Sequence, residues 1–300
     1  MVRVELGSIG TAMVTPFNED GKIDYEVTAL LINHLIDNGT NSLIVNGTTG
    51  ESPTLSDEEK EQLLTHAISI VDGRIPVIAG TGSNDTQASI RATKRAEQLG
   101  ADGAMLVVPY YNKPDQQGMY EHFRRIAENT SLPILLYNIP GRSGVNMSAD
   151  TVIRLSKITN IEAVKEASGD LAQMAAIIEG TNDTFNVYSG DDALTLPLLA
   201  IGGAGVVSVS SHIAGLEMQR MISDFQNGNT ASAATHHQTL MPLFQAVFSK
   251  PNPVPIKYFL RKAGLPVGDV RLPLVGISGE DSYLDLTMQT FKRHFGSKKE

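Results

Sequence analysis

Eight short apolar segments, each followed by a segment with a helical pattern, constrain the fold of this chain more than any other feature. The apolar segments are rich in Val and Ile, as parallel strands buried on both faces are. They span residues 9–14, 42–45, 76–79, 103–107, 133–137, 161–165, 186–189 and 205–209. Eight strand–helix units in roughly 220 residues predict a (β/α)8 barrel, or TIM barrel, a fold of about 250 residues. The alternative, a doubly wound open sheet, usually has fewer strands.

The helical segments between and after these strands span residues 24–38, 57–71, 85–99, 116–129, 149–155, 171–179, 193–201 and 216–226. Ser56 and Glu59 stand at the start of the second helix with the spacing of a capping box. Helices should end at glycines, and these are Gly39, Gly73, Gly100 and Gly180. The helical pattern therefore supports the same eight-unit repeat as the strands.

After Asn229 the strand pattern stops, and residues 230–248, 255–263 and 282–295 have helical patterns separated by proline and glycine. We therefore expect a catalytic barrel at residues 1–228 and a small helical subdomain at residues 229–300. The last four residues, 297–300, are expected to fray.

Composition excludes several classes of function. The net charge of -9 leaves no basic stripe for nucleic acid. The absence of cysteine excludes disulfides and thiol chemistry. Residues 1–17 contain no basic apolar leader, so we expect a cytoplasmic protein without a signal peptide. Residues 193–216 carry no charged side chain, but their proline, glycines and histidine favour a helix, a turn and a buried strand over a membrane span.

Lys165 ends the sixth apolar segment, at the tip of a strand that we expect to be buried. Burial disfavours the charged form of a lysine, which lowers its pKa and leaves more free amine. A free amine in a pocket forms Schiff bases with keto compounds. The alternative is that Lys165 only leaves the barrel and pairs with Glu166, and this segment alone leaves both interpretations open.

Other polar residues also gather at the ends of the predicted strands, where barrel enzymes carry their chemistry. Residues 47–51 (Gly-Thr-Thr-Gly-Glu) could offer several N–H and O–H donors to a carboxylate, although five such residues alone favour an ordinary turn. Three of the eight tyrosines, Tyr110, Tyr111 and Tyr137, stand at such ends. A phenol can pass protons when hydroxyl groups link it into a chain. Together with Lys165, these tyrosines favour a catalytic role.

Arg142 follows the fifth predicted strand and carries a fixed, forked cation that suits a carboxylate. Its alternative role is a surface ion pair with Asp150 or Glu166. The seven histidines are scattered without the spacing of a metal site. No phosphate-binding or dinucleotide-binding motif follows a strand, so we expect neither a metal nor a cofactor.

At these residues the chain resembles the pyruvate-dependent Schiff-base aldolases and lyases, and most closely the dihydrodipicolinate synthase family. The resemblance covers nearly the whole chain. It is carried by residues 47–51 (GTTGE), 109–112 (PYYN), 137–142 (YNIPGR), 164–166 (VKE) and 251–257 (PNPVPIK), in the same order and spacing. Arg142 and the motif at 251–257 favour the synthases over the N-acetylneuraminate and sugar-acid lyases, which share the lysine and the tyrosine at 137.

The resemblance implies that Lys165 forms a Schiff base with pyruvate. It also implies that Thr48 and Thr49 bind the pyruvate carboxylate, and that Tyr137 and Tyr111 relay protons together with Thr48. The enamine then attacks L-aspartate 4-semialdehyde, and the adduct closes to the heterocycle that leads to diaminopimelate and lysine.

Three further residues are expected to contact the substrates. Arg142 matches the family's arginine that holds the carboxylate of the semialdehyde. Gly190 directly follows the seventh predicted strand and Val207 lies within the eighth, and we expect both in the substrate site. The predicted substrate-binding set is therefore Thr49, Arg142, Val207 and Gly190.

In this family Tyr111 reaches into the active site of a neighbouring subunit, so the resemblance implies a homodimer, commonly paired into a tetramer. Feedback-inhibited relatives bind lysine at the dimer interface, where a histidine and a glutamate are replaced here by Lys60 and Ala88. We therefore expect weak or absent inhibition by L-lysine. The rest of that interface pocket is still recognisable in Ser52, Asn84 and Tyr110.

Two alternatives to synthase activity follow from the same residues. The chain could be another pyruvate-dependent aldolase or lyase, acting on N-acetylneuraminate or a keto-sugar acid. It could also be a barrel that binds keto acids without converting them. The second would be marked by the loss of Lys165, Tyr137 or Thr48, and all three are present.

Overall fold

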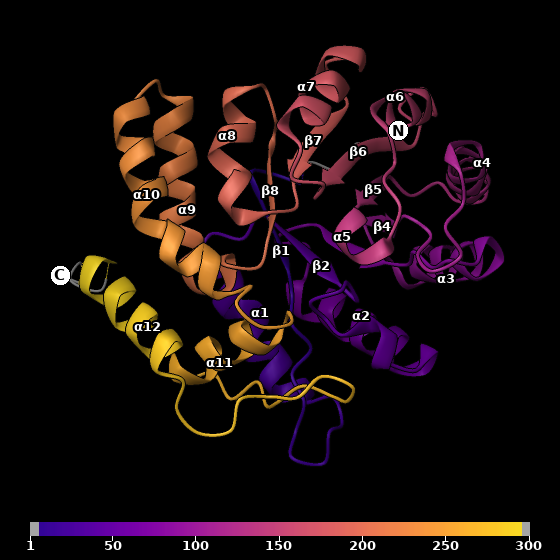
Figure 1. Ribbon diagram of the computed structural model, residues 1–300. Coiled ribbons are helices and arrows are strands. Elements are labelled where there is room, and N and C mark those ends of the chain that lie inside the picture. Colours follow the sequence, from indigo (N-terminus) through magenta and orange to yellow (C-terminus); the bar gives the residue numbers. More distant parts are fainter. Residues whose placement is uncertain (1–5, 296–300) are drawn as a thin grey trace.

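The computed structural model describes residues 6–295 and contains a closed barrel of eight parallel strands in chain order (Figure 1). The strands are β1 (Ile9–Ala12), β2 (Ser42–Val45), β3 (Val77–Gly80), β4 (Gly103–Val107), β5 (Ile134–Asn138), β6 (Ile161–Glu166), β7 (Asn186–Ser189) and β8 (Gly205–Ser208). The barrel closes because β8 pairs with β1, which places Gly10 beside Val207. The predicted fold class is confirmed, and every predicted strand lies within two residues of an observed one.

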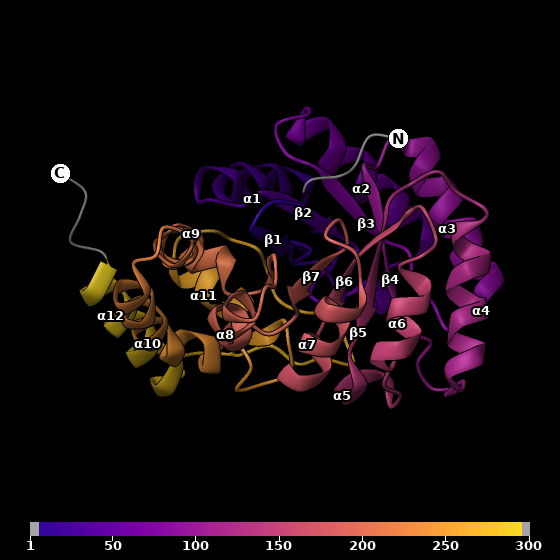
Figure 2. The same ribbon diagram turned by 90° about the horizontal axis from the view of Figure 1, so that it is seen from above.

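Helices surround this barrel, as both views show (Figures 1 and 2). They are α1 (Tyr25–Asp37), α2 (Asp57–Val71), α3 (Thr86–Leu99), α4 (Gln116–Ala127), α5 (Pro140–Ser143), α6 (Ala149–Leu155), α7 (Leu171–Gly180), α8 (Thr195–Ala200) and α9 (Ser211–Gln226). Two 3-10 turns, η1 (Ser52–Thr54) and η2 (Asp192–Leu194), lie between them. The predicted capping box of α2 is confirmed, because Ser56 Oγ accepts from the Glu59 N–H at 3.1 Å and Glu59 accepts from the Ser56 N–H at 2.9 Å.

Three helices differ from the sequence prediction. The segment predicted as one helix at 193–201 is divided into η2 and α8. Helix α9 begins five residues earlier than predicted, at Ser211, because two helical pieces join across a kink at Ala214. Helix α5 was not predicted, although a proline at its first position and a left-handed glycine after its end, Gly144, are the usual signals of a short helix.

Side chains alternate between the inside and the outside of the barrel along each strand, as strand geometry requires. The inward residues form their own apolar cluster, which comprises Ala12, Ile44, Ile78, Met105, Leu135, Tyr137, Ala163, Tyr188 and Val207, together with Leu6. The outward residues pack against the helices in two other clusters; Val164, for example, lies in one of these. This alternation decides which strand-end side chains can reach an active site inside the barrel mouth.

The C-terminal part of the described chain forms α10 (Thr230–Ala246), α11 (Val254–Lys262) and α12 (Ser282–Phe295). In both views these helices lie together on one side of the barrel, beside α9 (Figures 1 and 2). Their apolar residues Leu243, Phe259 and Leu284 belong to the same buried cluster as Ile9 and Leu31 of the barrel. The division of the chain at residues 228 and 229 stays a prediction, and the predicted fraying at 297–300 lies outside the described residues.

No helix within residues 6–295 is long and apolar enough to cross a membrane. Within the uncharged stretch at 193–216, a helix (α8), a turn and a strand (β8) follow one another as its proline and glycines predicted, and residues 211–216 begin α9. Gly202 ends the helix with a φ of 99°, a conformation that favours glycine.

Candidate active site

Tyr137 and Lys165 lie side by side at the carboxyl ends of neighbouring strands. The parallel register pairs Tyr137 of β5 with Lys165 of β6, and Lys165 with Tyr188 of β7. The ammonium nitrogen of Lys165 lies 4.3 Å from the centroid of the Tyr137 ring. The structure therefore brings together the predicted nucleophile and the predicted proton carrier in one layer of the barrel interior.

Burial changes the acid–base chemistry of Lys165. Its side chain is buried at 5% relative exposure. Burial lowers the pKa of Lys165 to about 8, the nearby Asp192 carboxylate opposes this shift, and the Arg142 guanidinium adds slightly to it. At neutral pH roughly a tenth of the lysine is then a free amine, far more than at an ordinary lysine. The residue has the chemistry of a Schiff-base nucleophile.

The alternative pairing of Lys165 with Glu166 is wrong. Adjacent strand residues point to opposite faces, so Glu166 points outward while Lys165 points inward. The Glu166 carboxylate accepts hydrogen bonds from the Asn138 amide at 3.0 Å, the Ser168 N–H at 2.8 Å and the Gln173 amide at 3.1 Å. Neutral donors thus satisfy this buried carboxylate, and burial raises its pKa.

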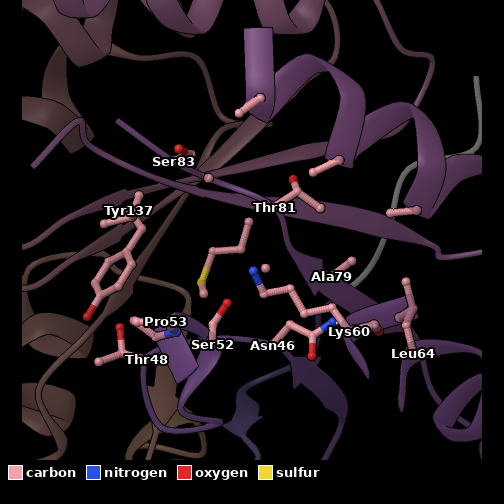
Figure 3. A pocket seen from close by; sticks show the side chains of 18 of the residues that line it. Asn46, Thr48, Ser52, Pro53, Lys60, Leu64, Ala79, Thr81, Ser83 and Tyr137 are labelled. Carbon is pink, nitrogen blue, oxygen red and sulfur yellow. Dashed lines mark hydrogen bonds between the residues drawn. The ribbon is translucent and has the colours of Figure 1, made fainter. Parts of the chain in front are cut away.

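Tyr137 is suited to hold and pass a proton. Burial raises the pKa of Tyr137 to about 12, while Arg142 and a hydrogen bond with Thr48 act in the opposite direction. The phenol is therefore protonated at neutral pH. Figure 3 shows its hydroxyl pointing toward Thr48. Thr48 and Tyr137, predicted as one relay, thus lie in contact at the barrel mouth.

The turn at residues 47–51 is held in a tight conformation. The Gly50 N–H donates to the Gly47 carbonyl at 3.1 Å, and the Glu51 N–H donates to the Thr48 carbonyl at 3.0 Å. Glu51 has a φ of 56°, in the left-handed region. Thr49 is buried, and its hydroxyl accepts a hydrogen bond of 2.9 Å from the side-chain amide of Asn252.

Arg142 lies on α5, the short helix that follows β5. Its side chain is exposed, and in the described part of the chain it makes no ion pair with Asp150 or Glu166. It lies close enough to Tyr137 and Lys165 to affect the pKa of both. The surface ion pair considered above is therefore wrong, and Arg142 stands at the mouth of the barrel as a cation without an ion-pair partner among residues 6–295.

Gly190 and Val207 have different relations to the site. A Cβ atom on Gly190 would lie 3.1 Å from Cε of Lys165 and 2.6 Å from Cβ of Ala167, so the glycine leaves room for the lysine side chain. Val207 is buried at 2% exposure in the inward cluster that contains Tyr137. Gly190 thus shapes the wall around Lys165, whereas Val207 belongs to the inward layer that contains Tyr137.

Tyr111 does not join Thr48, Tyr137 and Lys165 in the active site of its own chain. It is 89% exposed and has a φ of 73°, a strained value for a residue other than glycine. Its neighbour Tyr110 is 40% exposed, and the carbonyl of Tyr110 accepts a hydrogen bond of 3.1 Å from Asn84.

A cavity of about 580 Å³ begins at the barrel mouth and continues into the groove between α2 and α3. Thr48, Tyr137 and Arg142 line the part of the cavity at the barrel mouth, while Lys165 lies against the Tyr137 ring and is not among the lining residues. The groove part is lined by Ser52, Lys60, Ala88, Arg91 and Tyr110. Figure 3 shows the Lys60 side chain extending into the cavity. The predicted effector pocket and the predicted active site are thus continuous in this single chain.

Lys257 is a second buried lysine, and burial lowers its pKa to about 8 as well. Its ammonium nitrogen, however, lies 2.7 Å from Glu51 and donates a 2.7 Å hydrogen bond to the carbonyl of Asp269. It also lies 4.2 Å from the centroid of the Phe17 ring. Because the Lys257 nitrogen is engaged by the Glu51 carboxylate and the Asp269 carbonyl, its position excludes it as the nucleophile despite its lowered pKa.

Sequence reasoning missed two residues of the site. Asp192 is buried at 1% exposure and favours the charged form of Lys165. One of its oxygens accepts from the Ser210 N–H at 2.8 Å, and the other has no hydrogen-bond partner among the described residues. Asn252 contacts Thr49 from a distance of 203 residues along the chain. The acidic pair after Gly190 was a possible signal for Asp192, whereas the role of Asn252 needed the tertiary structure.

Comparison with known proteins agrees with this geometry. Residues 5–289 match the dihydrodipicolinate synthetase family. A 4-hydroxy-tetrahydrodipicolinate synthase from Bacillus velezensis is 56% identical over 284 residues, which cover 95% of this chain and 98% of that protein. The crystal structure of a dihydrodipicolinate synthase from Bacillus anthracis has a TM-score of 0.94 at 55% identity, covering 96% of this chain and 99% of the other.

A further crystal structure, of a dihydrodipicolinate synthase from Cyanidioschyzon merolae with lysine bound, has a TM-score of 0.93 at 49% identity and covers 98% of this chain and 99% of the other. The matches span both the barrel and the C-terminal helices, and they agree with the resemblance stated from the motifs. The chain belongs to the dihydrodipicolinate synthetase family.

Proposed function

We propose that this protein condenses pyruvate with L-aspartate 4-semialdehyde through a Schiff base on Lys165, forming 4-hydroxy-tetrahydrodipicolinate on the route to diaminopimelate and lysine. The observation that carries the proposal is the buried Lys165 amine, whose lowered pKa and position beside Tyr137 suit attack on a keto group. The family and the names of relatives at up to 56% identity support the same reaction.

The first half of the reaction forms the Schiff base. The free amine of Lys165 attacks the keto carbon of pyruvate, and the resulting carbinolamine loses water to give a protonated imine. Expulsion of hydroxide needs a proton donor, and Tyr137 keeps its proton at neutral pH because its pKa is raised to about 12. Thr48 lies in contact with this phenol and completes a short relay. Loss of a methyl proton then converts the imine into an enamine.

In the second half, the enamine carbon attacks the aldehyde carbon of L-aspartate 4-semialdehyde. Arg142 stands exposed at the cavity mouth, without an ion pair in the described chain, and can receive the carboxylate of this substrate. Attack of the substrate's amino group on the imine carbon then closes the ring and releases Lys165. Because the protein has a net charge of -9, a local cation is needed to hold this anion.

We further propose a cytoplasmic homodimer, paired into a tetramer, in which Tyr111 completes the relay of a second subunit. The 89% exposure and strained backbone of Tyr111 support this role, because a strained, exposed aromatic residue is expected where another surface covers it. The expectation that L-lysine inhibits weakly also stays a prediction. The cationic Lys60 side chain inside the cavity supports it, because it would repel a second ammonium group.

Trapping with borohydride tests the nucleophile. Incubation with pyruvate and borohydride should add one reduced pyruvate per chain, mapped to Lys165 by mass spectrometry. The rate should rise with pH up to about 8 and then level, because the free amine of Lys165 is the reactive form. Lys165→Arg should abolish the adduct. An adduct on Lys257, which shares the lowered pKa, would show that the assignment of the nucleophile is wrong.

Substitutions in the relay should reduce turnover while the fold is retained. Tyr137→Phe should lower kcat by about 10²–10⁴-fold, the usual contribution of a positioned acid–base group. Adding Thr48→Val should cost much less than the product of the two single losses, because members of one relay are not additive. Kinetics would be compared with thermal denaturation of each variant. Fully multiplicative losses would contradict a shared relay.

Arg142→Ala should weaken the use of L-aspartate 4-semialdehyde and leave the reaction with pyruvate intact. A hydrogen bond to a charged group contributes about 1.5–3 kcal/mol, which corresponds to roughly ten- to hundredfold weaker use of L-aspartate 4-semialdehyde. Trapping of pyruvate on Lys165 should continue. Arg154→Ala, which removes an exposed arginine of α6, is the matched control. If semialdehyde use and pyruvate trapping decrease by the same factor, Arg142 has a structural role.

Mixing of inactive variants tests Tyr111. Tyr111→Phe chains and Lys165→Ala chains should each be inactive, and mixing them should restore part of the activity, since one site of each mixed dimer contains both intact residues. Tyr283→Phe, which alters another exposed tyrosine, should be active alone. Subunit exchange would be verified with differently tagged chains. Absence of recovery after verified exchange would place Tyr111 outside the partner's site.

A further inference from the structure

The tail motif at residues 251–257 contacts the substrate turn and does not line the cavity. Lys257 of α11 is completely buried, and its nitrogen lies 2.7 Å from Oε1 of Glu51, the last residue of the 47–51 turn. The contact is a close ion pair between two buried side chains. The Lys257 nitrogen also donates to the carbonyl of Asp269. The C-terminal region thus places a charge directly beneath the turn that carries Thr48 and Thr49.

Glu51 is held from two sides. Its second oxygen accepts a hydrogen bond of 2.8 Å from the N–H of Arg271. The Arg271 side chain continues along the same loop, donating to the Thr54 carbonyl at 2.8 Å and to Glu59 at 2.5 Å and 2.9 Å. Lys257 and Arg271 also lie 4.2 Å and 4.4 Å from the centroid of the Phe17 ring. A carboxylate fixed in this way has little freedom to move.

The backbone of the turn needs such support. Glu51 has a φ of 56°, and Asn46 before the turn has a φ of 60°. Residues other than glycine adopt this region only where the surrounding structure holds them there. A third C-terminal contact, from Asn252 to the Thr49 hydroxyl at 2.9 Å, orients a side chain within the turn. Two of the three contacts, from Lys257 and Arg271, act on Glu51, which is itself left-handed. The third acts on Thr49, which lies between the left-handed residues Asn46 and Glu51.

We propose that Lys257 is a positioning residue for pyruvate binding: through its ion pair with Glu51 it holds the 47–51 turn in the conformation that presents Thr48 and Thr49 to the substrate carboxylate. This inference rests on the proposed function. Replacement of a buried ion pair by apolar side chains is often neutral for stability, so the pair is better explained by the conformation that it selects. Suitable variants should therefore bind pyruvate more weakly while they keep a stable fold.

Borohydride trapping at graded pyruvate concentrations tests this without the second substrate. In Lys257→Met, the pyruvate concentration for half-maximal trapping on Lys165 should rise about tenfold to a hundredfold, as expected for a misplaced binding group. Trapping at saturating pyruvate should remain close to that of the parent protein. Lys257→Arg keeps the charge and should be affected less. Lys262 is an exposed lysine on the same helix as Lys257, and it pairs with Asp285 of α12. Lys262→Met should leave the half-saturating pyruvate concentration unchanged.

Lys257→Met leaves Glu51 buried without its counter-charge, so this variant could lose binding by misfolding. A second variant separates that effect from the positioning role. The double variant Glu51→Gln/Lys257→Met removes both charges and should fold, and it should also show raised half-saturation by pyruvate. A double variant that folds and traps pyruvate at the parent concentration, with only a lower Tm, would overturn the proposal. Failure of the parent protein to trap pyruvate would instead contradict the proposed function.

Discussion

Closure of the barrel places the inward side chains of neighbouring strands in shared layers, and the candidate active site depends on this constraint. Parallel register sets Tyr137, Lys165 and Tyr188 side by side, and alternation along β6 turns Lys165 inward while Glu166 points to the helices. A shift of one residue in β6 would reverse these roles. The position of the amine is therefore a property of the sheet and not of local loops.

The same low-dielectric interior acts on two groups in opposite directions. Burial lowers the pKa of Lys165 to about 8 and raises that of Tyr137 to about 12, because each shift favours the neutral form. An amine able to attack and a phenol able to donate thus arise from one physical cause. Lys257 shows that burial alone does not make a nucleophile. Its pKa also falls to about 8, yet its nitrogen is engaged by the Glu51 carboxylate and the Asp269 carbonyl and is not available to attack a substrate.

The substrate turn is controlled by residues that are distant in sequence. Glu51 and Thr49 receive an ion pair and hydrogen bonds from Lys257, Arg271 and Asn252, at separations of up to 220 residues. The C-terminal helices share the apolar cluster of the barrel, so they do not form an independent covering layer. If Lys257 positions the turn as proposed, the lysine of the tail motif at 251–257 serves to hold Thr48 and Thr49 where they bind the pyruvate carboxylate.

The eight strand–helix units, the capping box at Ser56 and the strand-end position of Lys165 could be predicted from the amino-acid order alone, because hydrophobic period and local capping are short-range properties. The sequence also located Arg142 and the 47–51 turn, but not the helix that carries Arg142. Three features became visible only in the folded chain: Glu166 points away from Lys165, Asp192 opposes the lowering of the Lys165 pKa, and Lys257 pairs with Glu51. These outcomes depend on packing and electrostatics between residues far apart in the chain, which no local pattern encodes.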